Sequence, residues 1–166
     1  MKKKKNILEK IKELPESSIL YLSVGAESPK VVEELRKEAV DVQWVEVYQP
    51  NSSFQGGLAL RDSLIGGEDA ARTEMTEAQL KETYLSHLKD LLDHMDIWNS
   101  LDLQSSKYVF PGEGKESALR ECYEDAKQLD VLEAKNYCIS GKRDEIVEYL
   151  EKTDISSILV DEVKIK

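Results

Sequence analysis

An uncharged run near the N-terminus, SILYLSV at residues 18–24, constrains the fold more than any other feature of the chain. Such a run is typical of a strand covered on both faces, as the strands of parallel sheets are. Ser28 and Pro29 then form a good helix start, and an apolar stripe as far as Ala39 predicts a helix. A second run, VQWVEVY at 42–48, predicts another strand. Strand, helix and strand in this order favour a right-handed parallel crossover.

The rest of the chain continues this alternation of helices and strands. Its last stretch, VDEVKIK, is expected to be an edge strand that Lys164 and Lys166 protect from unwanted pairing. A turn is expected at Gly141. The remaining expected helices cover residues 1–15, 76–98, 116–129 and 144–152, and the remaining expected strands cover residues 107–110, 136–140 and 155–160.

These elements predict one domain, residues 1–166, of the three-layer α/β class. The expected sheet is mostly parallel with helices on both faces, in a Rossmann-like arrangement. Residues 51–75 contain four glycines and scattered polar residues, which indicates a long loop. Loops of this length in compact domains usually have a functional role.

The formal net charge of −10 repels a phosphate backbone, so no nucleic-acid partner is expected. The basic block Lys2–Lys5 is followed by Glu9 and Glu13, and we expect it to be a solubilising terminus rather than a membrane contact. No run approaches the ~20 apolar residues that cross a bilayer, and no apolar run follows the lysines as in a signal peptide. These observations predict a cytoplasmic protein without a membrane partner.

The turn Gly25-Ala26-Glu27-Ser28 is the first candidate ligand site. It follows the presumed central strand and opens a helix, the place where open parallel sheets bind ligands. With Gly141 and Lys142 it would form the rim of a pocket at the strand ends. The alternative is an ordinary structural turn, since the segment has one glycine where a dinucleotide fingerprint has three.

A second candidate is the loop between residues 110 and 117, in which Gly112, Gly114, Lys115 and Ser117 resemble parts of a phosphate-binding loop. The match fails in detail, because Glu116 stands where a serine or threonine should reach magnesium. The alternative is a tight loop that leads into a helix.

No residue pattern predicts a catalytic centre, a metal site or a specific cofactor. His87 and His94 are seven residues apart on the long expected helix, whereas helical metal ligands prefer a spacing of four. Cys122 and Cys138 lack the close spacing of a zinc or redox motif and are expected to be small buried apolar residues.

Two segments resemble the universal stress protein family. ILYLSVGAESPKVVEEL is similar to the family's first strand, turn and helix, and YCISGKRDEIVEYLEKTDISSILVDE is similar to the elements that precede its nucleotide-binding loop. The resemblance implies a small α/β domain with a five-stranded parallel sheet that often dimerises. Gly25 stands where the family usually has an aspartate that meets adenine, and no glycine-rich phosphate loop follows Asp161. The resemblance therefore implies a member that does not bind ATP or one that has diverged in the ATP-binding motifs.

Three functions follow from these observations. The first is a regulatory or stress-type domain that binds a small ligand or a protein partner without hydrolysing ATP, and that forms a homodimer through an edge strand or an apolar helix face. The second is an enzyme that acts on a phosphorylated or nucleotide-like substrate at the 112–117 loop. The third is an acidic interaction module that binds a basic protein partner.

Overall fold

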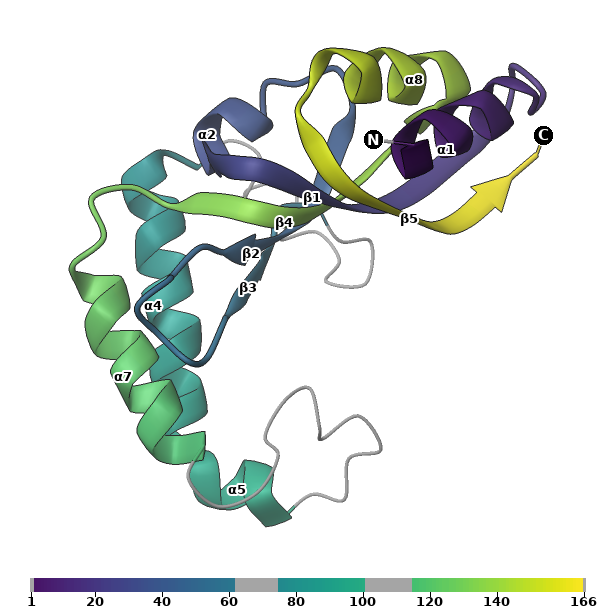
Figure 1. Cartoon of the computed structure of the whole chain (residues 1–166). Coiled ribbons are helices and arrows are strands. Elements are labelled where there is room, and N and C mark those ends of the chain that lie inside the picture. The colour runs from purple at the N-terminus through teal and green to yellow at the C-terminus, as the bar shows by residue number, and fades with distance from the viewer. Residues whose placement is uncertain (1, 62–74, 101–114, 166) are drawn as a thin grey trace.

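The computed structural model of the protein describes residues 2–61, 75–100 and 115–165 (Figure 1). These residues form six helices and five strands. The helices are α1 Lys2–Lys12, α2 Val32–Leu35, α4 Glu77–Asp93, α5 Met95–Ser100, α7 Lys115–Lys127 and α8 Arg143–Lys152. The strands are β1 Ile19–Val31, β2 Asp41–Val47, β3 Gly57–Ala59, β4 Glu133–Lys142 and β5 Ile155–Lys164.

The strands form one sheet in the order β3-β2-β4-β1-β5, and all neighbouring pairs are antiparallel. The prediction of a mostly parallel, Rossmann-like sheet is therefore wrong. So is the parallel sheet that the resemblance to universal stress proteins implied. The physical reason lies in β4, which pairs antiparallel with both β1 and β2 and separates them. Because of this, β1 and β2 point the same way without being neighbours.

The same arrangement recurs at the C-terminal end, where β4 and β5 point the same way and β1 lies between them. Two units, β1-α2-β2 and β4-α8-β5, are thus each split by a strand of the other. This interlocked pattern is the split β-α-β, or ferredoxin-like, arrangement. Here β3 is added to one edge, and α4, α5 and α7 are inserted between β3 and β4.

The helix expected to start at Ser28 is also wrong, because β1 continues through Gly25 to Val31 and the helix that follows has four residues. In β1, Leu20, Leu22 and Val24 are buried, whereas the side chains between them are half-buried. Since successive side chains point to opposite faces of a strand, β1 is covered mainly on one face. Ile19 and Tyr21 are apolar and lie on the other face, so the run at residues 18–24 resembled a strand that is covered on both faces.

Several other elements agree with the expectations. The long helix α4 begins after Thr76, whose side chain accepts a hydrogen bond from the Gln79 backbone in a capping box. The leading helix, β2, α7 and α8 are present, and β5 is an edge strand as expected. The expected loop contains the short strand β3, and the strand expected at 107–110 lies outside the described residues.

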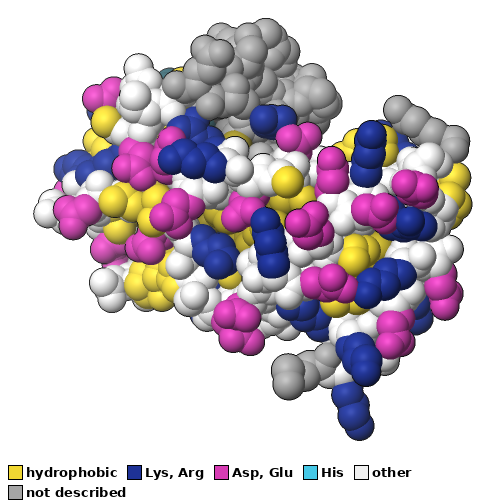
Figure 2. Space-filling view, turned by 90° about the horizontal axis from the view of Figure 1, so that it is seen from above, with side chains coloured by type: hydrophobic (Ala, Val, Ile, Leu, Met, Phe, Trp, Pro, Cys, Tyr) yellow, Lys and Arg dark blue, Asp and Glu magenta, His cyan; other side chains and the backbone are white. Residues whose placement is uncertain are grey.

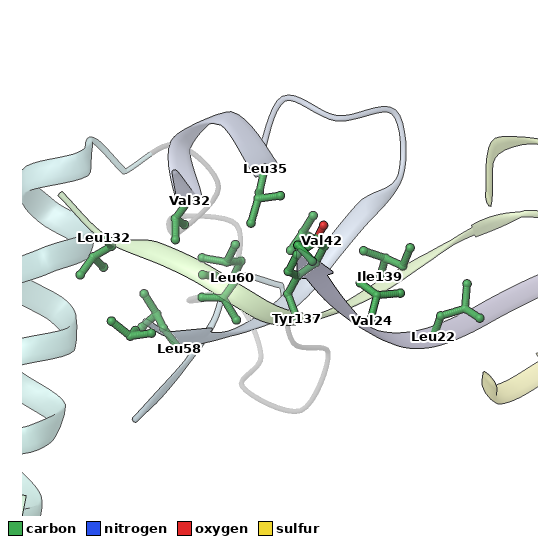
Figure 3. Packing of buried hydrophobic residues seen from close by; sticks show 14 of the residues in the cluster. Leu22, Val24, Val32, Leu35, Val42, Leu58, Leu60, Leu132, Tyr137 and Ile139 are labelled. Atoms are coloured by element: carbon green, nitrogen blue, oxygen red, sulfur yellow. The ribbon is translucent and has the colours of Figure 1, made fainter. Parts of the chain in front are cut away.

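Helices α1, α2 and α8 lie on one side of the sheet, and α4 and α7 form a hairpin beside one end of the sheet (Figure 1). The core between the sheet and helices α1, α2 and α8 contains apolar side chains from most strands (Figure 3). The hydroxyls of Tyr137 on β4 and Tyr149 on α8 are both buried and hydrogen-bond to each other. This contact fixes α8 over the centre of the sheet.

We predict that Leu22→Ala lowers the free energy of unfolding by about 2–5 kcal/mol, because Leu22 is fully buried and the smaller side chain leaves a cavity. Leu159→Ala is the matched control, since Leu159 is 64% exposed on β5 and its truncation should cost under about 0.5 kcal/mol. Urea denaturation monitored by circular dichroism measures both changes. Equal losses in the two variants would contradict the described core.

Candidate functional site

The free edge of β5 is the candidate functional site. This ten-residue strand pairs with β1 on one side, and no strand of the described residues pairs with its other side. Its backbone N–H and C=O groups along that side are therefore available to another strand. Six large apolar side chains of the described residues are exposed, and four of them lie on β5 or directly after it: Leu159 (64%), Val160 (38%), Val163 (36%) and Ile165 (63%).

The exposed apolar side chains occupy both faces of this edge. Val160 lies opposite Leu22 and Val163 lies opposite Leu20, so both point to the face that carries the helices. Leu159 lies opposite Ser23 and points to the other face. A strand that pairs with β5 would therefore find apolar contacts on each side of the sheet.

Two features limit indiscriminate pairing at this edge. The register of β5 against β1 shifts so that Asp161 has no partner position, and the Ser23 Oγ donates a hydrogen bond to the Asp161 carboxylate at 2.6 Å. Lys164 extends over the Tyr21 ring, with its Nζ 5.1 Å from the ring centre. Bulges and edge lysines oppose the pairing of arbitrary strands.

A groove of about 540 Å³ runs between the start of α1 and the first half of β5. Its apolar part consists of Ile7, Leu8, Ile155 and Ile158. Its polar lining consists of Lys3, Lys4, Lys5, Glu27, Asp154, Ser156 and Ser157. The groove thus combines an apolar floor with ammonium groups, next to the candidate edge.

Helix α1 is strongly basic, although the protein as a whole is acidic. It holds six lysines and one glutamate, which gives it a net charge of +5. Since the whole chain has a net charge of −10, the residues outside α1 together carry −15. Lys4 Nζ donates to the Thr153 carbonyl at 2.9 Å, and Lys12 forms an ion pair with Glu151 at 2.6 Å. On the face that carries α1, side chains of both charges are interspersed with apolar surface (Figure 2).

The predicted pocket rim is not assembled at one place. Gly25 lies within β1 opposite Asn136 and Ser157, whereas Gly141 lies opposite Leu20. Five residues along a strand separate these two positions, which is roughly 17 Å. In the segment that follows Gly25, Ala26 is buried, and Glu27 and Ser28 are exposed. Lys142 is exposed where β4 leads into α8. The expected meeting of the two turns depended on parallel strand ends, which this sheet does not have.

The second candidate loop falls mostly outside the described part of the chain. Gly112 and Gly114 lie outside it, Lys115 is the first residue of α7, and Ser117 is exposed in the first turn of that helix. His87 and His94 do not share a metal site, because no group of three or more metal-ligating side chains exists among the described residues. His94 Nδ1 instead lies 2.8 Å from the Asp90 carbonyl.

A buried polar cluster escaped the sequence analysis. Gln49 is fully buried, and its Oε1 accepts hydrogen bonds from the Tyr84 hydroxyl at 2.5 Å and the Cys122 thiol at 3.2 Å. Its Nε2 donates to the Asp125 carboxylate at 2.9 Å. A methyl group at Gly56 would clash with the Tyr84 hydroxyl, so glycine there leaves room for the contact. No sequence motif could reveal the cluster, since its members come from a loop and two separate helices.

This cluster has the character of a structural tie rather than of a reactive centre. Burial raises the pKa of the Tyr84 hydroxyl and of the Cys122 thiol above their ordinary values. Activated nucleophiles have lowered pKa values, because the deprotonated form reacts. The cluster therefore anchors the α4–α7 hairpin to the segment that follows β2.

No protein-family description, curated protein or solved structure matches this chain. No described helix has the length and the apolar character needed to cross a membrane.

We predict that the protein loses stability as pH rises above about 10, where unfolded tyrosines ionise. Burial raises the folded pKa of Tyr84 and Tyr137, so the folded state keeps protons that the unfolded state releases. The stabilisation is complete below the unfolded pKa and declines above it. Urea unfolding between pH 8 and 11 measures the slope, and Tyr84→Phe should reduce it. A flat profile would argue against buried, neutral phenols.

Proposed function

We propose that this protein is an interaction module that binds an extended segment of another protein as an additional strand along β5. The observation that carries the proposal is the free ten-residue edge with exposed apolar side chains. In strand addition, main-chain hydrogen bonds supply affinity and side-chain contacts supply specificity. The apolar side chains on both faces of β5 suit this mode of binding.

The electrostatics favour a different protein over a second copy as the occupant. In an antiparallel pair of β5 strands related by a two-fold axis, both α1 helices lie on the same face of the joined sheet, beside the junction. Each α1 carries a net charge of +5, and like charges brought together repel. The homodimer expected from the sequence is therefore the less favoured use of this edge.

A random dodecapeptide library displayed on phage tests the proposal, with the folded protein as immobilised target. We expect selected peptides to protect the amides of residues 155–164 from hydrogen exchange. The double variant Leu159→Lys/Ile165→Lys should lose most of this binding, because the added ammonium groups replace apolar contacts. Both side chains are more than half exposed, so the variant should fold.

The matched control is Ile97→Lys, which changes an apolar residue on α5 that is 50% exposed. It should bind the selected peptides like the unaltered protein. Peptides that bind the double variant equally well, or that protect amides elsewhere, would overturn the proposal. A stable dimer in analytical ultracentrifugation that the double variant abolishes would assign the edge to a second copy instead.

A further inference from the structure

The two halves of the β5 edge have different surroundings. The first part of β5, residues 155–158, lines the groove together with the preceding Asp154 and with Lys3, Lys4 and Lys5. The second half carries the exposed Leu159, Val160 and Val163. A segment bound along β5 would therefore meet ammonium groups at one end and an apolar surface at the other.

The lysines of the groove are available to an anionic ligand. Within the described residues, neither Lys3 nor Lys5 has an ion-pair partner, and Lys4 is held by the Thr153 carbonyl rather than by a carboxylate. Glu27 and Asp154 also line the groove, so three ammonium groups face two carboxylates. The balance is positive, and it occurs in a chain whose remaining surface is strongly negative.

The direction of the bound segment follows from the sheet. Every strand pair is antiparallel, and antiparallel pairing is slightly more stable per residue than parallel pairing. An antiparallel segment would place its C-terminal half beside Ile155–Ile158 and its N-terminal half beside the apolar second half of β5. Its side chains that point to the helix face would lie next to α1.

We infer that the partner segment has an apolar N-terminal half and an acidic C-terminal half. This inference rests on the proposed strand addition. Carboxylates of the acidic half pair with the ammonium groups of Lys3 and Lys5. The aliphatic stems of these acidic side chains contact Ile7 and Ile158 on the groove floor. The apolar half covers Leu159 and Val163. Charge at one end thus fixes both the direction and the register of the segment.

Fluorescein-labelled synthetic peptides test the inference by fluorescence anisotropy with the whole protein. The probe is TVTVTVEEDE, the same length as β5, with its reversed sequence and a lysine version, TVTVTVKKKK, as comparisons. We expect the forward peptide to bind about tenfold more tightly than either comparison, as a few surface ion pairs allow. Raising the salt from about 50 to about 500 mM should remove most of the difference.

The variant Lys3→Glu/Lys5→Glu should invert the preference, so that the lysine version binds more tightly than the acidic one. Lys10→Glu is the matched control, because Lys10 is an exposed lysine at the other end of α1. If all three peptides bind equally well and Leu159→Lys/Ile165→Lys still weakens their binding, this inference is overturned and strand addition stands. Absence of binding at about 1 mM, or binding insensitive to that double variant, would overturn both.

Discussion

The antiparallel pairing of β4 with β1 and β2 is the constraint on which the rest of the structure depends. It brings two distant parts of the chain into one sheet and leaves β5 as an edge. It also places the Tyr137 hydroxyl under α8, where it meets Tyr149. With β4 removed, β1 and β2 would lose their common neighbour. Buried apolar side chains of both units belong to the same core cluster, so the interlocked units share one core.

Local features of the sequence predicted individual elements well, because they depend on neighbouring residues. Thr76 and Gln79 are three positions apart and form the capping box that starts α4. The sheet order could not be predicted in the same way, since an apolar strand does not specify which strand lies beside it. Ile19 and Tyr21 gave a one-sided strand the appearance of a doubly covered one. That misreading of the pattern led to the parallel fold.

The candidate site was predictable in one part only. The C-terminal stretch was expected to be an edge strand because of its lysines, and β5 is one. Its apolar exposure depends on which elements pack beside β5 in the folded chain, and local sequence pattern does not determine this. The Gln49 cluster joins residues 35 and 73 positions apart, so only the folded chain reveals it. Such contacts are set by tertiary packing rather than by motif.

The position of β4 in the sheet has a consequence for synthesis on the ribosome. Ser23 on β1 and Cys138 on β4 are paired across 115 residues. At ordinary translation rates, roughly 6 to 23 seconds pass between the emergence of these two positions. During that time β1 and β2 have no central strand to pair with, and their apolar faces are open to other nascent chains. The nascent chain is therefore most exposed to aggregation in that interval.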